Sequence, residues 1–535
     1  MMLPGLASRI TPFRRSACKR LNATSTRAGL VWPPQQRSFS TTMTMRYQIG
    51  PEPEARQSLF SKMGEAAATT FASVVVLGLG FAGAGYAYHQ LYKWLQLQKI
   101  HNAFEPGAEP ILALAGKNVP APPNWVIREE QTRIDDIVSA NETGHYYLLM
   151  GDKGCGKSSM LIEAMRKVDG DGCAMLEASN SVEVFRIRLG KAIDYEYHED
   201  YIGGYFSERG PRESTALLDI ERAMNKLEKV ALIHRAKKNK PLILIINQTH
   251  LIRDDNEGKD LLELLQHRAE AWCASNLVSV VFTTDDYWVY ERLKRRATER
   301  MVVMTINDLP KPQAVMALQR YRHRYFAEDV DVSILEEIYD KVGGRLSFLN
   351  RVAKSRDMLT TCDCIKEIEK TWFLNSCAIL GSEMDDDVMD QQKFASASMV
   401  LALALVDREE DMEQTYDPET GHILPYFPMH KAQEIMTRAD FIRELDRLNI
   451  FTIDSEAHVR ASSVPMQRAF KEICSQPGFR QFLQDTLDRI AAIESLGRTR
   501  ELVAKDLVQG GKYRISKPIS LDGRVEIRLE QDKKD

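Results

Sequence analysis

The sequence predicts an α/β protein with a doubly wound parallel sheet, a helical region after it and one transmembrane helix ahead of it. Between about residues 125 and 305, apolar segments of strand length alternate with segments of helix length, the order of a parallel sheet covered by helices. Leu242–Ile246 is uniformly aliphatic, which is typical of a strand buried on both faces. Ala66–Tyr88 is 23 residues without a charged side chain, long enough to cross a bilayer.

A glycine-rich loop lies at the first strand–helix junction. The apolar run His145–Met150 precedes it, and the helical pattern of Ser159–Lys167 follows it. The loop fits G-x-x-x-x-G-K-[ST], in which glycines turn backbone N–H groups toward an anion, a lysine contacts phosphates and a hydroxyl binds Mg²⁺. The sequence therefore predicts a P-loop that binds ATP and Mg²⁺. Its expected contact residues are Gly151, Asp152, Lys153, Gly154, Cys155, Gly156, Lys157, Ser158 and Ser159.

A second segment stands just ahead of the loop. Trp125-Val126-Ile127-Arg128-Glu129-Glu130 resembles the entry segment of archaeal-type and origin-recognition-type AAA+ ATPases and of their signalling relatives. In those families the segment packs on adenine, which implies that Ile127 and Arg128 lie near the base. The resemblance covers about residues 125–355 and implies a nucleotide-binding core over 125–305 and a helical lid over 306–390.

The residues after the aliphatic strand depart from this family. AAA+ proteins place an Asp and usually a Glu there, to hold Mg²⁺ and to polarise the attacking water. This sequence has Asn247, which would keep one carbonyl ligand for the metal, and Gln248, which cannot accept the proton of water. We therefore expect nucleotide binding with slow or absent hydrolysis.

The resemblance also implies two sensors of the phosphates. Thr283, at the end of the strand Leu277–Thr283, corresponds to sensor I, and Arg345, after Gly343-Gly344, corresponds to sensor II of the lid. An arginine finger, which would complete a neighbour's site in a homo-oligomer, often lies in the region that here contains Arg295, Arg296 and Arg300. A solvated basic helix is the alternative interpretation of those arginines, and the sequence favours it.

Residues 391–500 are expected to form a winged-helix domain. Helical segments are followed by a hairpin, Ile450–Ile453 and His458–Ala461, which is the winged-helix order. The candidate recognition helix, Arg438–Arg447, has balanced charges, and residues 391–500 hold 13 basic and 17 acidic residues. DNA readers need a positive face, so the pattern favours docking of protein partners and makes nucleic acid unlikely. Residues 501–535 are expected to be a tail or one more hairpin.

The N-terminal segments predict a location. Residues 1–51 contain eight basic residues and no acidic one, which is typical of a mitochondrial transit peptide, with cleavage after Phe39. Cleavage removes seven positive charges and changes the net charge from −4 to −11. A transit peptide before one span predicts the inner mitochondrial membrane. A one-charge bias around the span favours the large domain in the intermembrane space, with the matrix as the alternative. The proline-rich residues 105–124 read as a spacer.

Three functions are compatible with these patterns. The first is a membrane-anchored AAA+ nucleotide switch or remodelling ATPase with weak hydrolysis. The second is a pseudo-ATPase scaffold that organises a membrane complex, and the third is a nucleoid DNA-binding protein, which the charge balance disfavours. The eight cysteines are scattered and indicate no disulfide framework or zinc site.

Overall fold

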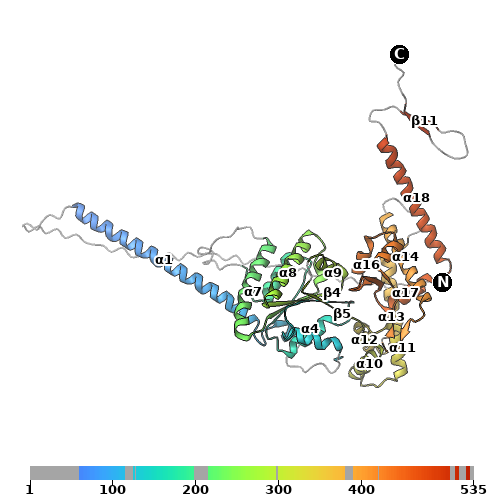
Figure 1. Ribbon diagram of the computed structural model, residues 1–535, viewed down its shortest axis with the longest axis horizontal. Helices are drawn as coiled ribbons and strands as arrows, with labels where there is room; N and C mark the ends of the chain where they lie inside the picture. Colours follow the sequence, from blue (N-terminus) through green and yellow to red (C-terminus); the bar gives the residue numbers. More distant parts are fainter. Residues whose placement is uncertain are drawn as a thin grey trace, which may run out of the picture. The chain divides into compact units, whose positions relative to one another are not determined.

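The structure is a computed structural model (Figure 1). It describes residues 59–114, 125–126, 128–197, 215–296, 299–379, 389–419, 421–506, 513–516 and 526–529. By contacts the chain divides into two compact units, Met1–Leu77 and Gly78–Asp535. The predicted transit peptide and Ile127 lie outside the described residues.

The first described element is a long helix, α1 (Leu59–Ala103). Within the described part of the chain, it is the one helix that is long and apolar enough to cross a membrane, over Met63–Ala103. The predicted span, 66–88, lies inside it. The helix continues beyond the predicted span through Lys93 and Lys99. Charged side chains end the apolar stretch, but they do not interrupt helical hydrogen bonding.

A parallel five-stranded sheet forms the centre of the second unit, as the sequence predicts. Its strands are β1 (Tyr146–Gly151), β2 (Cys173–Glu177), β3 (Leu242–Asn247), β4 (Val278–Thr284) and β5 (Met301–Ile306). Their order is β2-β3-β4-β1-β5, so that β4 lies between the strand that leads into the P-loop and β3. All four pairings are parallel, which brings the carboxyl ends of the strands to one edge.

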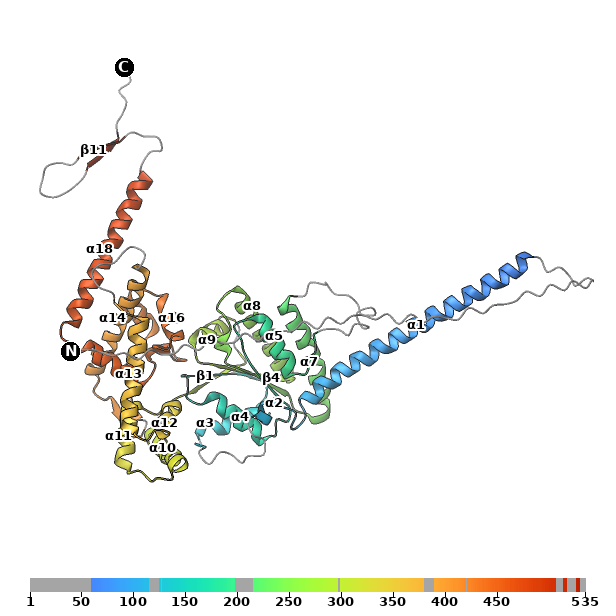
Figure 2. The same cartoon turned by 180° about the vertical axis from the view of Figure 1, so that it is seen from behind.

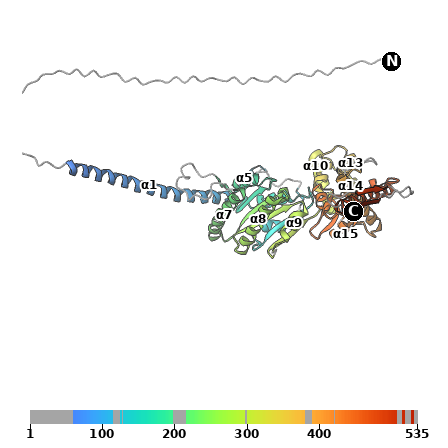
Figure 3. The ribbon, with the colours of Figure 1, turned by 90° about the horizontal axis from the view of Figure 1, so that it is seen from above.

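Helices cover both faces of this sheet (Figures 1 and 2). One face carries α5 (Val182–Ala192), α7 (Ala216–Lys238), α8 (Asn256–Ala274) and α9 (Tyr287–Lys294). In Figure 3, α7, α8 and α9 lie side by side. The other face carries α2 (Pro110–Leu114), α3 (Glu129–Val138) and α4 (Lys157–Lys167). Because strand side chains alternate, Tyr146 and Leu148 enter the first core and Tyr147 and Leu149 the second.

The first half of the predicted spacer, 105–124, packs against the core. The backbone N–H of Gly107 donates to Asp169 O at 2.8 Å, and Leu112 of α2 is buried against α4. Glu109 is also buried, and burial raises its pKa to about 7. The apolar side chains of α2 find a complementary surface at the end of α4, and this packing overrides the extended preference of the prolines. Residues 115–124 lie outside the described residues.

A helical subdomain with its own core follows β5. Its helices are α10 (Lys311–Phe326), α11 (Val332–Val342), α12 (Leu346–Ala353) and α13 (Met358–Ser376). Leu318, Ile338, Leu349 and Ile365 meet in this core. The N-terminus of α12 points to the P-loop, because Ser347 N donates to Gly154 O at 3.2 Å. The subdomain therefore occupies the place expected of the lid.

A winged-helix domain follows the lid. It contains α14 (Met389–Asp411), α15 (Met429–Met436), α16 (Phe441–Arg447), α17 (Val464–Cys474), α18 (Phe479–Asp506) and the antiparallel sheet β8-β10-β9 (Tyr426–Pro428, His458–Ala461, Phe451–Ile453). A two-stranded ladder, β6 (Tyr416–Asp417) and β7 (Gly421–His422), lies between α14 and β8. The predicted hairpin of the tail is present as β11 (Tyr513–Ser516) paired with β12 (Glu526–Leu529).

Candidate nucleotide-binding site

A cavity of about 560 Å³ lies between the P-loop, the carboxyl ends of β3 and β4, and the lid. This volume suits a nucleotide, which needs a concave site with a few placed polar groups. Its lining residues come from these three parts and from the segment ahead of α3: Trp125, Val126, Arg128, Lys153, Gly154, Gly156, Lys157, Ser158, Ser159, Met160, Gln248, His250, Leu251, Thr283, Asp285, Tyr321, Leu346, Ser347 and Asn350.

The P-loop has the backbone shape that its glycines allow. Gly154 and Gly156 have φ of +85° and +108°, and a Cβ on Gly154 would stand 2.4 Å from Ser347 Oγ. The Nζ of Lys157 donates to Gly151 O at 2.9 Å and to Asp152 O at 2.8 Å, which holds the loop closed around the start of α4. Lys153, Gly154, Gly156, Lys157, Ser158 and Ser159 line the cavity, whereas the Cys155 side chain is buried in the core beneath the loop.

The end of β3 meets the loop through Asn247. The Ser158 hydroxyl donates to Asn247 Oδ1 at 2.9 Å, and the Thr283 hydroxyl donates to the same oxygen at 2.7 Å. The backbone N–H of Gln248 donates to Thr283 Oγ1 at 2.8 Å, and Gln248 itself has a left-handed backbone with φ of 55°. The structure thus brings together the three predicted residues Ser158, Asn247 and Thr283, with Gln248 at the cavity wall.

The side chains at this site fit a bound nucleotide, but they fit its metal ion only in part. Ser158 and Asn247 would hold Mg²⁺, and Lys157 would contact the phosphates, but Asn247 contributes no negative charge. Among the described residues, no cluster of three His, Cys, Asp or Glu side chains is present that would bind a metal by itself. A cation at this site would therefore depend on phosphate oxygens as additional ligands.

Arg345 is in a different environment from the one that sensor II implies. Its Nη2 donates to Asp152 Oδ2 at 2.6 Å, to Asp308 Oδ2 at 3.1 Å and to the Ser462 carbonyl at 2.6 Å. Arg460 of the winged helix also donates to Asp152 Oδ2, at 2.7 Å. The carboxylates of Asp152 and Asp308 neutralise the guanidinium charge of Arg345. Arg345 is buried and is not among the residues that line the cavity.

Asp152 is the centre of this ionic network. Burial opposes its charge, but Arg460 and Arg345 hold its pKa below the usual value. Its side chain faces the lid and the winged helix, while its backbone carbonyl accepts a hydrogen bond from Lys157. The sequence predicts Asp152 as a contact residue of the nucleotide, but its side chain is not among the residues that line the cavity, and no local pattern signals its distant partners.

The base side of the cavity is formed by residues that the sequence only partly anticipates. Arg128 lines it, but its Nη2 donates to Cys155 O and its Nη1 to Asn307 O, each at 2.9 Å. Arg128 thus braces the P-loop. Trp125, Val126 and Tyr321 supply the apolar wall, and Tyr321 comes from α10, which the entry segment could not reveal.

Two further residues, Asp285 and His250, were not predicted. Asp285 Oδ1 lies 2.8 Å from Lys157 Nζ, and the Asp285 backbone N–H donates to His250 Nδ1 at 3.2 Å. Burial lowers the pKa of His250, and the nearby lysines act in the same direction against the pull of Asp285. The signal in the sequence is the pair Asp285-Asp286 directly after a strand, at the edge where the P-loop lies.

A P-loop at the carboxyl edge of a parallel sheet, beneath a helical lid and beside a winged helix, defines an AAA-type nucleotide-binding protein. Comparison with protein families agrees. Residues 124–281 match the AAA ATPase domain, and residues 375–494 match the C-terminal winged-helix domain of fungal AAA proteins. The chain therefore contains an AAA ATPase domain, followed by a C-terminal winged-helix domain of the fungal AAA kind. AAA ATPase domains bind nucleotide, typically with Mg²⁺.

The chain is also similar to solved structures at low identity. The Walker-type ATPase PABY2304 of Pyrococcus abyssi is 13% identical over 65% of this chain and 96% of its own, with a TM-score of 0.42. The Aeropyrum pernix ORC1 protein, solved in complex with DNA, is 13% identical over 65% and 94%, with a TM-score of 0.31. Drosophila ORC bound to DNA is 12% identical over 63% and 92%, with a TM-score of 0.31. No curated protein matches the sequence.

Proposed function

We propose that this protein is a membrane-anchored nucleotide switch, in which ATP-Mg²⁺ at the P-loop changes the position of the winged helix. One observation carries the proposal. Asp152 of the loop holds Arg345 of the lid and Arg460 of the winged helix on the same carboxylate oxygen, at 2.6 and 2.7 Å. A rearrangement of the loop around phosphates would move this carboxylate and so disturb both domains together.

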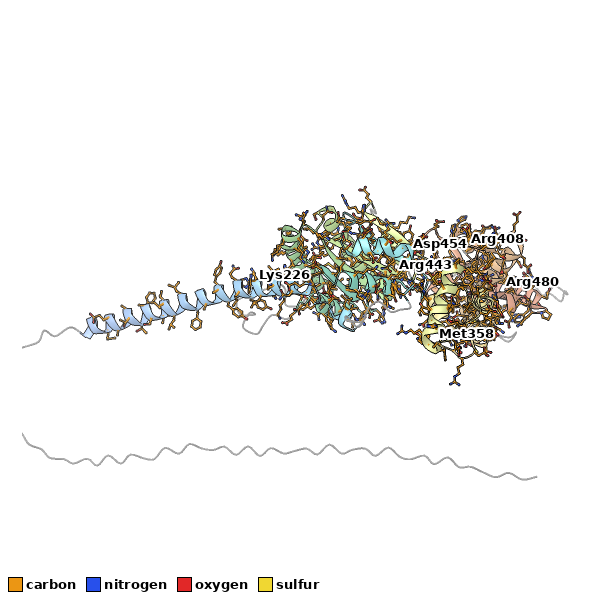
Figure 4. All side chains as sticks on the ribbon, turned by 90° about the horizontal axis from the view of Figure 1, so that it is seen from below. Lys226, Met358, Arg408, Arg443, Asp454 and Arg480 are labelled. Carbon is orange, nitrogen blue, oxygen red and sulfur yellow. The ribbon has the colours of Figure 1, made fainter. Side chains whose placement is uncertain are left out.

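Other contacts of the winged helix suit a reversible interface. Arg443 of α16 pairs with Glu291 at 2.7 Å, and Thr305 Oγ1 lies 2.9 Å from Ser455 Oγ. Figure 4 shows Arg443 and Asp454 on the side of the winged helix that meets the core. These contacts are polar, and polar interfaces within a chain resemble transient protein–protein interfaces more than permanent ones.

Disulfide trapping tests the switch. The Thr305–Ser455 distance brings cysteines at these positions within disulfide reach, and the exposed Cys364 would first be changed to serine. We expect ATP with Mg²⁺ to slow formation of the Thr305→Cys/Ser455→Cys crosslink. Lys157→Ala should abolish both ATP binding and the nucleotide effect. ATP binding that survives Lys157→Ala would remove the P-loop assignment, and a crosslinking rate indifferent to bound ATP would remove the switch.

A pseudo-ATPase scaffold is the second candidate, because Asn247 and Gln248 lack the charges of a hydrolytic site. In that case nucleotide is structural, and the chain organises a membrane complex through its span and winged helix. Turnover separates the two functions. A rate at background that does not rise in Asn247→Asp/Gln248→Glu would favour the scaffold.

The proposed partners are proteins that dock on the winged helix, and a homo-oligomer is compatible with the AAA domain. Nucleic acid is the weaker candidate, because the candidate recognition helix is engaged with the core. Arg447 of α16 pairs with Asp254 at 2.7 Å, and Asp446 accepts a hydrogen bond from Tyr287 N at 2.8 Å. Salt-dependent binding of DNA at physiological ionic strength would overturn this view.

The proposed location is the inner mitochondrial membrane, with the large domain in the intermembrane space. The basic composition of residues 1–39 and the apolar helix α1 support it. Protease protection of intact mitoplasts tests the orientation, since exposure of the AAA domain to protease is expected and full protection would place it in the matrix. Proximity labelling from the same membrane would identify the partners.

A further inference from the structure

The nucleotide site is lined by a carboxylate that comes from neither the P-loop nor the end of β3. Strand β4 lies between β1 and β3, with Met150 opposite Thr284 and Ile246 opposite Phe282. The residue that follows Thr284 therefore leaves the sheet beside the P-loop and near the end of β3. That residue is Asp285, and it lines the cavity together with Lys157 and Gln248.

Asp285 is held in place by its neighbours. Its Oδ1 lies 2.8 Å from Lys157 Nζ, and its side chain is 17% exposed. Its backbone N–H donates to His250 Nδ1 at 3.2 Å, while His250 Nε2 lies 3.8 Å from Asp285 Oδ2. Because Nδ1 accepts this hydrogen bond, its lone pair is not available as a base. His250 is thus a positioning residue for Asp285.

Hydrolysis of a phosphoanhydride by water is accelerated by a group that orients the water, and further by a group that accepts its proton. The amides of Asn247 and Gln248 cannot accept it, and Asn247 Oδ1 already receives hydrogen bonds from Ser158 and Thr283. Among the described residues that line the cavity, Asp285 is the one with a carboxylate. Asp285 is paired with Lys157 in this structure. When phosphate oxygens bind Lys157 instead, the Asp285 carboxylate becomes free to contact water.

We propose that Asp285, delivered by β4 in place of the missing acids of β3, is the catalytic carboxylate of this site. The water oxygen bonds to the γ-phosphorus, and the bond from that phosphorus to the bridging oxygen breaks. Its electron pair stays on the departing ADP, while the proton of water passes to Asp285 and then to solvent. The inference rests on the proposed ATP-binding function and names the residue behind the weak hydrolysis expected of it.

Asp285→Asn tests the inference in the full-length protein in detergent, with two measurements. We expect the single-turnover rate of ATP hydrolysis to fall about a hundredfold or to the Lys157→Ala baseline. ATP affinity, measured with a fluorescent ATP analogue, should stay or tighten by about threefold, because an anion that competes for Lys157 is gone. Asp286→Asn is the matched control. This adjacent acid is buried and is not among the lining residues, so its variant should keep the wild-type rate.

Several outcomes would overturn the inference. They are an Asp285→Asn rate equal to wild type, an equal loss in Asp286→Asn, a loss of ATP affinity in Asp285→Asn, and a wild-type rate no higher than that of Lys157→Ala. A wild-type protein that binds no ATP would instead refute the proposed function. The binding measurement therefore distinguishes the two failures.

Discussion

Replacing Arg460 with methionine should loosen the winged helix from the P-loop. The arginine donates to Asp152 Oδ2 at 2.7 Å, and the two side chains are 22% and 6% exposed. Methionine keeps the apolar stem but loses the guanidinium. The change therefore removes the bond across the interface with little loss of packing volume.

The magnitude follows from what remains on the carboxylate. In the variant, Asp152 still accepts a hydrogen bond from Arg345 at 2.6 Å, so its buried charge remains paired. The loss of stability therefore stays below the roughly 3–5 kcal/mol of an unpaired buried charge. Loss of one hydrogen bond to a charged group costs about 1.5–3 kcal/mol. A value near 2 kcal/mol corresponds to about a 30-fold change in the equilibrium between docked and released winged helix.

Urea denaturation of the full chain in detergent measures this cost, and the Thr305→Cys/Ser455→Cys crosslinking rate reports release of the domain. Arg480→Met is the matched control, because Arg480 is 61% exposed and pairs with Asp407 on the surface, away from Arg443 (Figure 4). That variant should cost less than about 1 kcal/mol. Equal losses in Arg460→Met and Arg480→Met, with unchanged crosslinking, would refute the reasoning.

Three other variants test the nucleotide site and the pH dependence of stability. Gly154→Ala should abolish ATP binding, because its Cβ would clash with Ser347 at a φ of +85°; ATP affinity measures it, and wild-type affinity would contradict it. Asn247→Asp/Gln248→Glu should raise turnover, since it restores acids beside Ser158; a phosphate-release assay decides. Asp286→Asn should flatten the pH dependence of stability. Burial, with help from Asp285, raises the Asp286 pKa from 3.8 to about 7, so stability present at acidic pH is lost as pH rises through about 7. The denaturation midpoints at pH 6 and pH 8 should differ more in the wild-type protein than in Asp286→Asn. An equal difference in the two proteins would count against the argument.

Local patterns were sufficient for much of the fold. The aliphatic run Leu242–Ile246 lies within β3 (Leu242–Asn247), and the P-loop glycines fix the loop by requiring positive φ. The winged-helix order was visible because short turns separate its helices and hairpin. Each of these signals lies within a few residues of the structure it specifies.

Tertiary structure decided what depends on distant partners. Asp152 meets Arg345 and Arg460 across 193 and 308 residues of chain, and Asp285 reaches Lys157 only because β4 lies next to β1. The first half of the predicted spacer packs on α4 for the same kind of reason, since its apolar residues contact a surface that another segment builds. Periodicity specifies which face of an element is apolar, and the order of the strands determines which charges meet.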